Sequence, residues 1–273
     1  MKRRRADERL FEEMRLESMA LARALIMEGR VLAGERKLRS PGESVREDEA
    51  LRVLGALDRY VSRGAHKLKK ALEVFDIDVR DRACVDVGAS TGGFTDVLLR
   101  AGARRVYAVD VGYNLLDYRL RSDTRVTVME RVNARFLRPE DFAERPSFGA
   151  TDVSFISLRQ VLPPTLSTLQ GEDRSFVALV KPQFEASRED VGEKGVVRSR
   201  SVHQRVLEQI VAFVPTLGWK CVGLDFSPIR GPEGNMEFLL HMRPGDAQAP
   251  ELPQGSISDT ICRAYDKFIK MPE

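Results

Sequence analysis

From residue 84 onward, short apolar runs alternate with segments in which apolar residues recur every three or four positions. The runs are typical of buried parallel strands, and the segments are typical of helices that cover a sheet. Strands are therefore predicted at 84–87, 105–110, 125–129, 149–153 and 176–181, and helices at 94–101, 114–120, 157–169 and 201–214. Two later runs, 220–226 and 236–242, have no helix between them, which predicts an antiparallel finish to the sheet. The pattern favours an α/β fold with a doubly wound, Rossmann-like sheet.

The first 53 residues follow a different pattern. Helices are predicted at 6–14 and 18–28, and short apolar pieces separated by Gly34, Pro41 and Gly42 predict a small twisted sheet. So few elements make only a small core, as in an accessory α+β module. Residues 54–62 form a predicted linker, and a helix at 64–75 opens the larger body. The predicted domains are thus 1–53 and 63–273, joined by the linker 54–62.

Composition narrows the classes of protein to consider. Of the 273 residues, 42% are hydrophobic and 31% charged, and no apolar run approaches the roughly 20 residues that span a bilayer. The basic start, Met1–Arg5, is not followed by the apolar segment of a signal peptide. We therefore expect a cytoplasmic protein that does not bind membranes. The three cysteines and three histidines are scattered, which predicts reduced thiols and no metal site.

Charge is distributed unevenly along the chain. Residues 1–70 carry 18 Lys and Arg against 12 Asp and Glu, a balance of +6, whereas the remaining residues have a balance of −3. A basic module on a slightly acidic body is typical of a polyanion-binding attachment. The alternative is an ordinary solvated, charged surface.

The segment Cys84–Phe94 joins a predicted strand to a predicted helix through a glycine-rich turn, which can seat a nucleotide-like ligand at the helix N-terminus. The turn reads GASTGG and lacks the second glycine that a pyrophosphate needs. A carboxylate two positions before it, Asp86, favours the amino group of S-adenosylmethionine (SAM) over a pyrophosphate. Asp110 ends the next strand 22 residues after Gly88, where it can accept ribose hydroxyls. The alternative is a plain strand–turn–helix. The candidate cofactor-binding residues are Asp86, Gly88, Ser90, Thr91, Gly92, Gly93, Phe94, Asp110 and Asp152.

Four charged residues are predicted to surround the same ligand edge. Asp152 and Lys181 follow strands, Glu237 lies in the last strand, and Lys67 lies in the helix before the sheet. Such a group perturbs the pKa values of its members, and a desolvated amine there can accept a proton from a sugar hydroxyl. The alternative for each residue is a surface ion pair. The catalytic hypothesis rests on their common position.

The residues after the fourth predicted strand indicate whether a SAM-dependent enzyme would methylate a nitrogen or an oxygen atom of its substrate. Enzymes that methylate nitrogen typically carry Asn/Asp-Pro-Pro-aromatic here, whereas this chain has Asp152-Val-Ser-Phe. Methylation of oxygen is therefore favoured. Phe155 is a candidate wall for a target base or ribose, with a core aromatic as the alternative.

Six motifs follow one another along the chain: YVSRGAHKLKKALE, VDVGASTGGFTDVLL, VYAVDVGYNLL, TDVSFISL, LVKPQFEA and GNMEFLL. Together they resemble the TlyA-type (hemolysin A) family, which has an FtsJ-like catalytic domain. The resemblance implies a seven-stranded SAM-dependent methyltransferase fold with its last strand antiparallel, preceded by an RNA-binding module of ribosomal-protein type. It also implies ribose 2′-O-methylation of ribosomal RNA, and it assigns the family's Lys-Asp-Lys-Glu tetrad to Lys67, Asp152, Lys181 and Glu237. The N-terminal signature departs from the family, with Arg15-Leu16-Glu17-Ser18-Met19 in place of Gly-Leu-x-x-Ser-Arg.

The hypothesis is a cytoplasmic enzyme that methylates a cytidine 2′-hydroxyl in ribosomal RNA or a ribosomal subunit, with SAM as cofactor and no metal. Lys181 would deprotonate or polarise the hydroxyl, Asp152 and Glu237 would set its charge state, and Lys67 would position the nucleotide. Two alternatives remain, a non-catalytic RNA-binding assembly factor and a membrane-damaging haemolysin. The candidate RNA-binding residues are Arg3, Arg4, Arg5, Arg23, Arg30, Lys37, Arg39 and Phe155.

Overall fold

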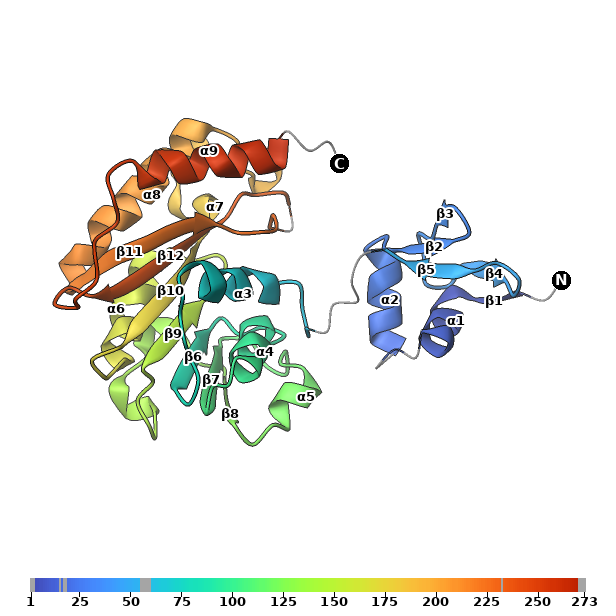
Figure 1. The fold of residues 1–273 in the computed structure, drawn as a ribbon, viewed down its shortest axis with the longest axis horizontal. Helices are drawn as coiled ribbons and strands as arrows, with labels where there is room; N and C mark the ends of the chain where they lie inside the picture. Colours follow the sequence, from blue (N-terminus) through green and yellow to red (C-terminus); the bar gives the residue numbers. More distant parts are fainter. Residues whose placement is uncertain (1–2, 15, 17–18, 55–59, 232, 270–273) are drawn as a thin grey trace. The chain divides into compact units, whose positions relative to one another are not determined.

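The computed structural model describes residues 3–14, 16, 19–54, 60–231 and 233–269 (Figure 1). The chain divides into two compact units, residues 1–59 and 60–273. Residues 55–59, most of the predicted linker 54–62, lie outside the described residues. Each unit is described below by itself.

The smaller unit packs two helices against two short sheets. Helices α1 (Ala6–Glu13) and α2 (Met19–Met27) cover a core that includes Leu10, Leu25 and Ile26. Strand β1 (Arg3–Arg5) pairs antiparallel with β4 (Ser44–Arg46), and β2 (Val31–Ala33) pairs with both β3 (Arg36–Lys37) and β5 (Leu51–Val53). The strand β1 was not predicted, because three consecutive arginines carry no apolar signal.

The larger unit is built on a seven-stranded sheet with the order β11-β12-β10-β9-β6-β7-β8. Strand β12 is antiparallel to both of its neighbours, β10 and β11, as the absence of a helix between the last two apolar runs predicted. The other neighbouring pairs are parallel. The strands are β6 (Ala83–Val87), β7 (Arg105–Asp110), β8 (Val126–Glu130), β9 (Phe148–Thr151), β10 (Ser175–Val180), β11 (Trp219–Phe226) and β12 (Phe238–Pro244).

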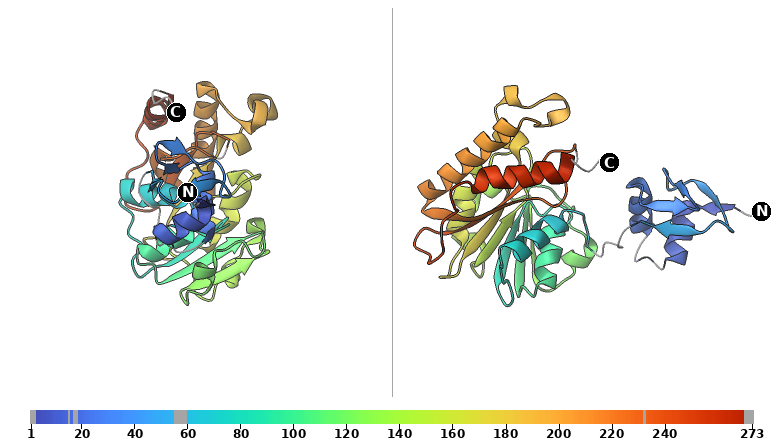
Figure 2. Two further views of the ribbon diagram at one scale, coloured as in Figure 1. Left: turned by 90° about the vertical axis from the view of Figure 1, so that its right-hand side faces the viewer. Right: turned by 45° about the horizontal axis from the view of Figure 1, so that its top comes forward.

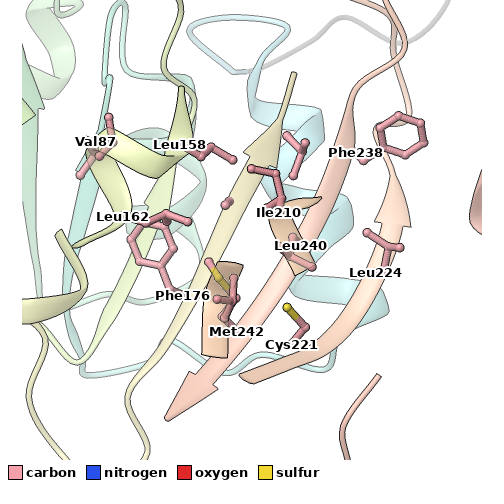
Figure 3. Close-up of a cluster of buried hydrophobic side chains, with 14 of the residues drawn as sticks. Val87, Leu158, Leu162, Phe176, Ile210, Cys221, Leu224, Phe238, Leu240 and Met242 are labelled. Carbon is pink, nitrogen blue, oxygen red and sulfur yellow. The ribbon is translucent and has the colours of Figure 1, made fainter. Parts of the chain in front are cut away.

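Alternate residues of the buried strands feed two separate cores, one on each face of the sheet. Val85 and Val87 point to the core under α6 and α8, whereas Cys84 joins the core under α3 and α4. Figure 3 shows part of the first core, and the right view of Figure 2 shows the sheet together with its helices. The helices are α3 (Ala65–Val74), α4 (Gly93–Arg100), α5 (Tyr118–Arg121), α6 (Leu158–Thr168), α7 (Pro182–Glu185), α8 (Arg200–Phe213) and α9 (Ser256–Ile269). Short 3₁₀ helices lie at Ala134–Phe136, Pro139–Asp141, Arg188–Asp190, Glu193–Gly195 and Val214–Leu217.

The helix predicted at 114–120 is the least accurate of the helix predictions, since α5 spans only Tyr118–Arg121. Asn114 adopts a left-handed φ of +56°, and the side chain of Asp117 accepts a hydrogen bond from the amide of Arg119. The local cap at Asp117 therefore starts the helix four residues late.

Two kinds of feature are absent from the described ranges. Among these residues, no helix is long and apolar enough to cross a membrane. The same residues contain no group of three or more His, Cys, Asp or Glu side chains that could hold a metal ion.

Candidate active site

The predicted site residues of the larger unit gather at the carboxyl edge of its parallel strands. Asp86 and Asp110 lie in β6 and β7, Asp152 directly follows β9, and Lys181 directly follows β10. Glu237 directly precedes β12, and because β12 runs in the opposite direction its start lies at this same edge. The antiparallel strand thus contributes a carboxylate at its start, whereas the parallel strands contribute side chains at or after their ends.

The four predicted tetrad residues form one connected cluster. Lys67 Nζ lies 3.1 Å from Asp152 Oδ2 and 2.8 Å from Glu237 Oε2. Lys181 Nζ lies 2.6 Å from Asp152 Oδ1 and donates a 2.9 Å hydrogen bond to Ser154 Oγ. Asp152 is therefore shared by both lysines, and Lys67 by both carboxylates. The side chain of Glu237 is only 1% exposed, so the cluster extends from solvent into the interior.

Burial and charge act against each other in this cluster. Burial works to lower the pKa of Lys67, but the charges of Asp152 and Glu237 outweigh it and the pKa is raised. Burial works to raise the pKa of Asp152, but Lys67 and Lys181 outweigh it and that pKa is lowered. Burial does raise the pKa of Glu237 in spite of Lys67. Two carboxylates therefore hold the positive charge of Lys67.

The glycine turn brings the backbone against the segment that carries Asp152. Gly88 has a φ of +85°, and a Cβ there would lie 2.8 Å from the carbonyl oxygen of Asp152. At the start of α4, a Cβ on Gly93 would lie 2.4 Å from Ser62 Oγ and 3.0 Å from the amide nitrogen of Ala65. A side chain at either position would collide with these neighbouring atoms. The glycines are therefore needed where the turn and the start of α4 pack closely against other segments of the chain.

Asp86 is fully buried beneath the turn. Its Oδ2 accepts hydrogen bonds from the amide (2.8 Å) and hydroxyl (2.7 Å) of Thr95. Its Oδ1 is buried without a hydrogen-bond partner in the described part of the chain. Burial raises the pKa of Asp86 to about 7, although the bonds from Thr95 oppose the shift. One carboxylate oxygen of Asp86 is thus bound by Thr95, and the other can still accept a hydrogen bond.

Asp110 ties the glycine turn to the next loop. Its Oδ2 accepts a 2.7 Å hydrogen bond from the amide of Ser90, and its Oδ1 accepts one of 2.7 Å from the amide of Gly112. Ser90 itself has a left-handed φ of +50° and is exposed. Of the other predicted turn residues, Thr91 is exposed, whereas Phe94 is 3% exposed and packs in the core with α3.

Two adjoining clefts contain nearly all of these residues. One of about 570 Å³ is lined by Gly88, Ser90, Asp110, Asp152 and Phe155. Another of about 240 Å³ shares Gly88, Ser90 and Asp152 with it and adds Asp86, Lys67 and Lys181. The larger volume is within the range of small-molecule sites.

Phe155 stands open to solvent at the mouth of the larger cleft. The side chain is 91% exposed, and its backbone has a φ of +63°, which is unfavourable for a bulky residue. Its ring contacts that of Phe184 at a centroid distance of 5.2 Å. The alternative of a core aromatic is therefore wrong. An exposed ring in a strained backbone at a cleft is a candidate ligand contact.

The remaining predicted RNA contacts all belong to the smaller unit, and several are already paired. Arg4 lies 2.8 Å from Glu12, while Arg5 and Arg23 lie 2.8 and 3.0 Å from the buried Asp7. These ion pairs fix where the guanidinium groups point but also offset part of their charge. The other members of the set are Arg3, Arg30, Lys37 and Arg39.

Several cleft residues were missed from the sequence. Ser154 holds Lys181, and Asn133, Ala134 and Arg135 line the larger cleft just after β8. The rule that ligands sit at carboxyl ends was applied to the other parallel strands but not to 125–129. Applied there as well, it would have indicated the segment that follows this strand.

The burial of Asp86 makes a prediction about stability. An acid with a higher pKa in the folded than in the unfolded protein destabilises the fold when it ionises. This cost in free energy begins as the pH rises above the pKa of the unfolded state, and it is complete above the pKa of the folded state. Replacing Asp86 with asparagine should therefore raise the free energy of unfolding at pH 8, by at most about 4 kcal/mol from the shift of 3.8 to about 7. The gain should shrink towards zero near pH 4. Urea unfolding across this range measures it.

The matched control for this experiment is Asp246→Asn, which changes an exposed carboxylate in the turn after β12. Its stability should follow the wild type at every pH. A gain for Asp86→Asn that is the same at pH 4.5 and pH 8 would contradict a buried, titrating carboxyl.

Comparison with known proteins gives consistent matches. Residues 60–244 match the model of the FtsJ-like methyltransferase family. YqxC of Bacillus subtilis, provisionally named an rRNA methyltransferase, is 49% identical and the match covers 100% of this chain and 99% of that one. The 16S/23S rRNA (cytidine-2′-O)-methyltransferase TlyA of Mycobacterium tuberculosis is 42% identical over 97% of this chain and 98% of its own. A solved structure from Streptococcus thermophilus, provisionally named a hemolysin, has a TM-score of 0.79 and 44% identity, covering 99% and 98% of the two chains.

Proposed function

Because the chain belongs to the FtsJ-like methyltransferase family, we propose that it transfers a methyl group from SAM to the 2′-hydroxyl of a cytidine in ribosomal RNA. The observation that carries the proposal is the connected cluster of Lys67, Asp152, Lys181 and Glu237 beside the glycine turn. A cluster of this kind at a ligand edge suits proton removal from a weakly acidic hydroxyl.

The residues around the turn fit SAM. The buried Oδ1 of Asp86 lacks a partner among the described residues, and an ammonium group supplies the donor that it needs. Gly88 and Asp110 line the larger cleft, where Asp110 offers lone pairs for ribose hydroxyls. When bound, SAM supplies a methyl group that is already activated for transfer. The protein is then required mainly for alignment and proton removal.

Lys181 is assigned the proton transfer. Lys67 is held cationic between two carboxylates, whereas Lys181 contacts one carboxylate that it shares with Lys67. In the proposed step the hydroxyl O–H bond breaks and its proton passes to the unshared electron pair of Lys181 Nζ. The oxygen forms the new bond to the methyl carbon as the bond from that carbon to the sulfonium sulfur breaks, which would leave a neutral thioether as the second product. Asp152 stabilises the ammonium that results, and Glu237 keeps Lys67 in place. Lys67, with its positive charge, is assigned to orient the nucleotide.

The RNA substrate is assigned to two surfaces. The basic residues of the smaller unit provide salt-dependent contacts to phosphates, with Arg4, Arg5 and Arg23 pre-oriented by their ion pairs. Phe155, exposed and beside the cleft, is assigned to stack on the target base or ribose. A ribosomal substrate places the enzyme in the cytoplasm.

Methyl transfer to ribosomal subunits tests the proposal. Small and large subunits from cells that lack this enzyme are incubated with labelled SAM, and the RNA is digested to nucleosides. We expect 2′-O-methylcytidine from one or both subunits, with yield falling as salt rises. Label in a methylated base would contradict the ribose assignment.

Two other outcomes would favour different functions. RNA binding without any label, unaffected by tetrad substitutions, would favour a non-catalytic assembly factor. The name of the Streptococcus thermophilus relative gives the other alternative, a hemolysin. Release of dye from liposomes by purified protein would support that alternative, and we expect none.

A further inference from the structure

Two segments that carry functional side chains lie side by side at the edge of the sheet. The first runs from Asp152 to Leu158, after β9, and the second from Lys181 to Glu185, after β10, its parallel neighbour. Near their beginnings Lys181 Nζ contacts Asp152 Oδ1 and Ser154 Oγ. Further along, the rings of Phe155 and Phe184 meet at 5.2 Å. The two segments are thus joined at more than one point.

Glu185 makes the last of these connections. Its Oε1 accepts a 2.6 Å hydrogen bond from the amide of Leu158, and its Oε2 accepts one of 2.7 Å from the hydroxyl of Ser157. Ser157 Oγ in turn accepts a hydrogen bond from the amide of Arg159 and caps α6. A carboxylate here is favoured both by the free amides of the helix start and by the helix dipole.

Because Glu185 lies only four residues after Lys181, these hydrogen bonds can influence the position of Lys181. The helix α7 has only four residues, Pro182–Glu185, and Lys181 is its N-cap. A helix this short has little stability of its own, so its placement depends on what holds its end. Glu185 holds that end, while Pro182 restricts the backbone directly after Lys181.

We propose that Glu185 is a positioning residue, which fixes Lys181 and Phe184 against Asp152 and Phe155 by fastening α7 to the start of α6. This inference rests on the proposed function, in which Lys181 removes the proton. Its role in this proposal is geometric, because both of its contacts are hydrogen bonds that a neutral amide can reproduce.

The test compares kcat of two variants at position 185. The reaction is methyl transfer to the ribosomal subunit that the wild type modifies. Glu185→Ala removes both hydrogen bonds and should lower kcat by about 10- to 100-fold, because small displacements of a reacting group are costly. Its SAM dissociation constant should stay within about threefold, since Asp86, Gly88 and Asp110 are unchanged. Glu185→Gln can accept from the Leu158 amide and donate to Ser157, so it should retain kcat within about threefold of the wild type.

The control is Glu189→Ala, which removes an exposed carboxylate four residues further along and should not change kcat. If Glu185→Ala does not fold, Ser157→Ala removes only one of the two bonds and should give a smaller loss of kcat. Wild-type kcat in Glu185→Ala would overturn the inference, as would Glu185→Gln as inactive as the alanine variant, because a charge would then be required.

Crystal structures of the wild type and Glu185→Ala give a readout independent of catalysis. We expect Lys181 Nζ to move away from Asp152 Oδ1 in the variant, and an unchanged Lys181 would overturn the inference. A wild type that transfers no methyl group would instead contradict the proposed function, and the position of Lys181 would still decide whether Glu185 sets it.

Discussion

Replacing Lys181 with alanine should lower kcat for methyl transfer by about 1000-fold while SAM affinity changes by less than about threefold. The side chain contributes the amine that takes the proton from the ribose hydroxyl in the proposed step. It is 9% exposed at the cleft, and within the described part of the chain its polar contacts are with oxygen atoms of Asp152 and Ser154. Single-turnover kinetics and calorimetry measure the two quantities separately.

The fold should tolerate this change. Asp152 keeps the contact of its Oδ2 with Lys67 when Lys181 is removed, so no buried charge is left without an opposite charge. A thermal transition close to that of the wild type is therefore expected, and a large loss of stability would mean that the kinetic effect reports unfolding.

Lys181→Arg separates two possible roles of the amine. A guanidinium preserves positive charge but does not release its proton in proteins, so it cannot serve as a proton acceptor. We expect this variant to be as inactive as Lys181→Ala. Substantial activity in the arginine variant would contradict proton transfer and favour a purely electrostatic role for Lys181.

Of the proposed substitutions, Lys67→Met should destabilise the protein most. We expect it to lower the free energy of unfolding by about 3–5 kcal/mol. Lys67 is 8% exposed and lies between Asp152 and Glu237, and the side chain of Glu237 is 1% exposed. Without the ammonium, Glu237 remains buried with no opposite charge in contact among the described residues. Denaturant unfolding measures the loss.

The loss should depend on pH in a definite direction. Burial already raises the pKa of Glu237, and removing Lys67 takes away the charge that opposes this shift. A carboxyl with a raised folded-state pKa stabilises the fold at low pH and destabilises it as pH rises. The deficit of Lys67→Met should therefore be larger at pH 8 than at pH 5.

A double substitution tests the cause. Adding Glu237→Gln removes the uncompensated charge, so Lys67→Met/Glu237→Gln should recover roughly half or more of the lost stability. The matched control is Lys69→Met, which replaces a lysine that is 50% exposed on the same helix and should cost little. A double variant less stable than Lys67→Met alone would contradict the explanation by buried charge.

The larger unit was well predicted because its signals are local. Each buried strand appears as a short apolar run, and the lack of a helix between the last two runs correctly indicated the antiparallel strand. The weaker predictions concern features that a local pattern does not carry. Strand β1 consists of Arg3–Arg5 and exists because it pairs with β4, and α5 begins late because of the cap at Asp117.

The site was predicted by combining strand ends with a family resemblance. Strand ends place Asp110, Asp152 and Lys181 at one edge, and they meet around the clefts described above. Ser154 and Glu185 lie within two of the quoted motifs, but the sequence did not indicate their roles, because their partners lie 27 or more residues away. The exposure of Phe155 was equally undecided until its left-handed backbone was known.

By itself, the sequence determined the fold class and the glycine turn, because hydrophobic periodicity and turn residues are properties of neighbouring residues. It also proposed the four tetrad residues, from strand ends together with the family resemblance. The tertiary structure alone decided how these residues share charge. Lys67 is held cationic because two carboxylates from distant segments, Asp152 and Glu237, converge on it and outweigh its burial. Lys181 is left with a carboxylate that it must share. Protonation depends on distances of a few ångströms between groups far apart in the chain, and the order of residues does not record those distances.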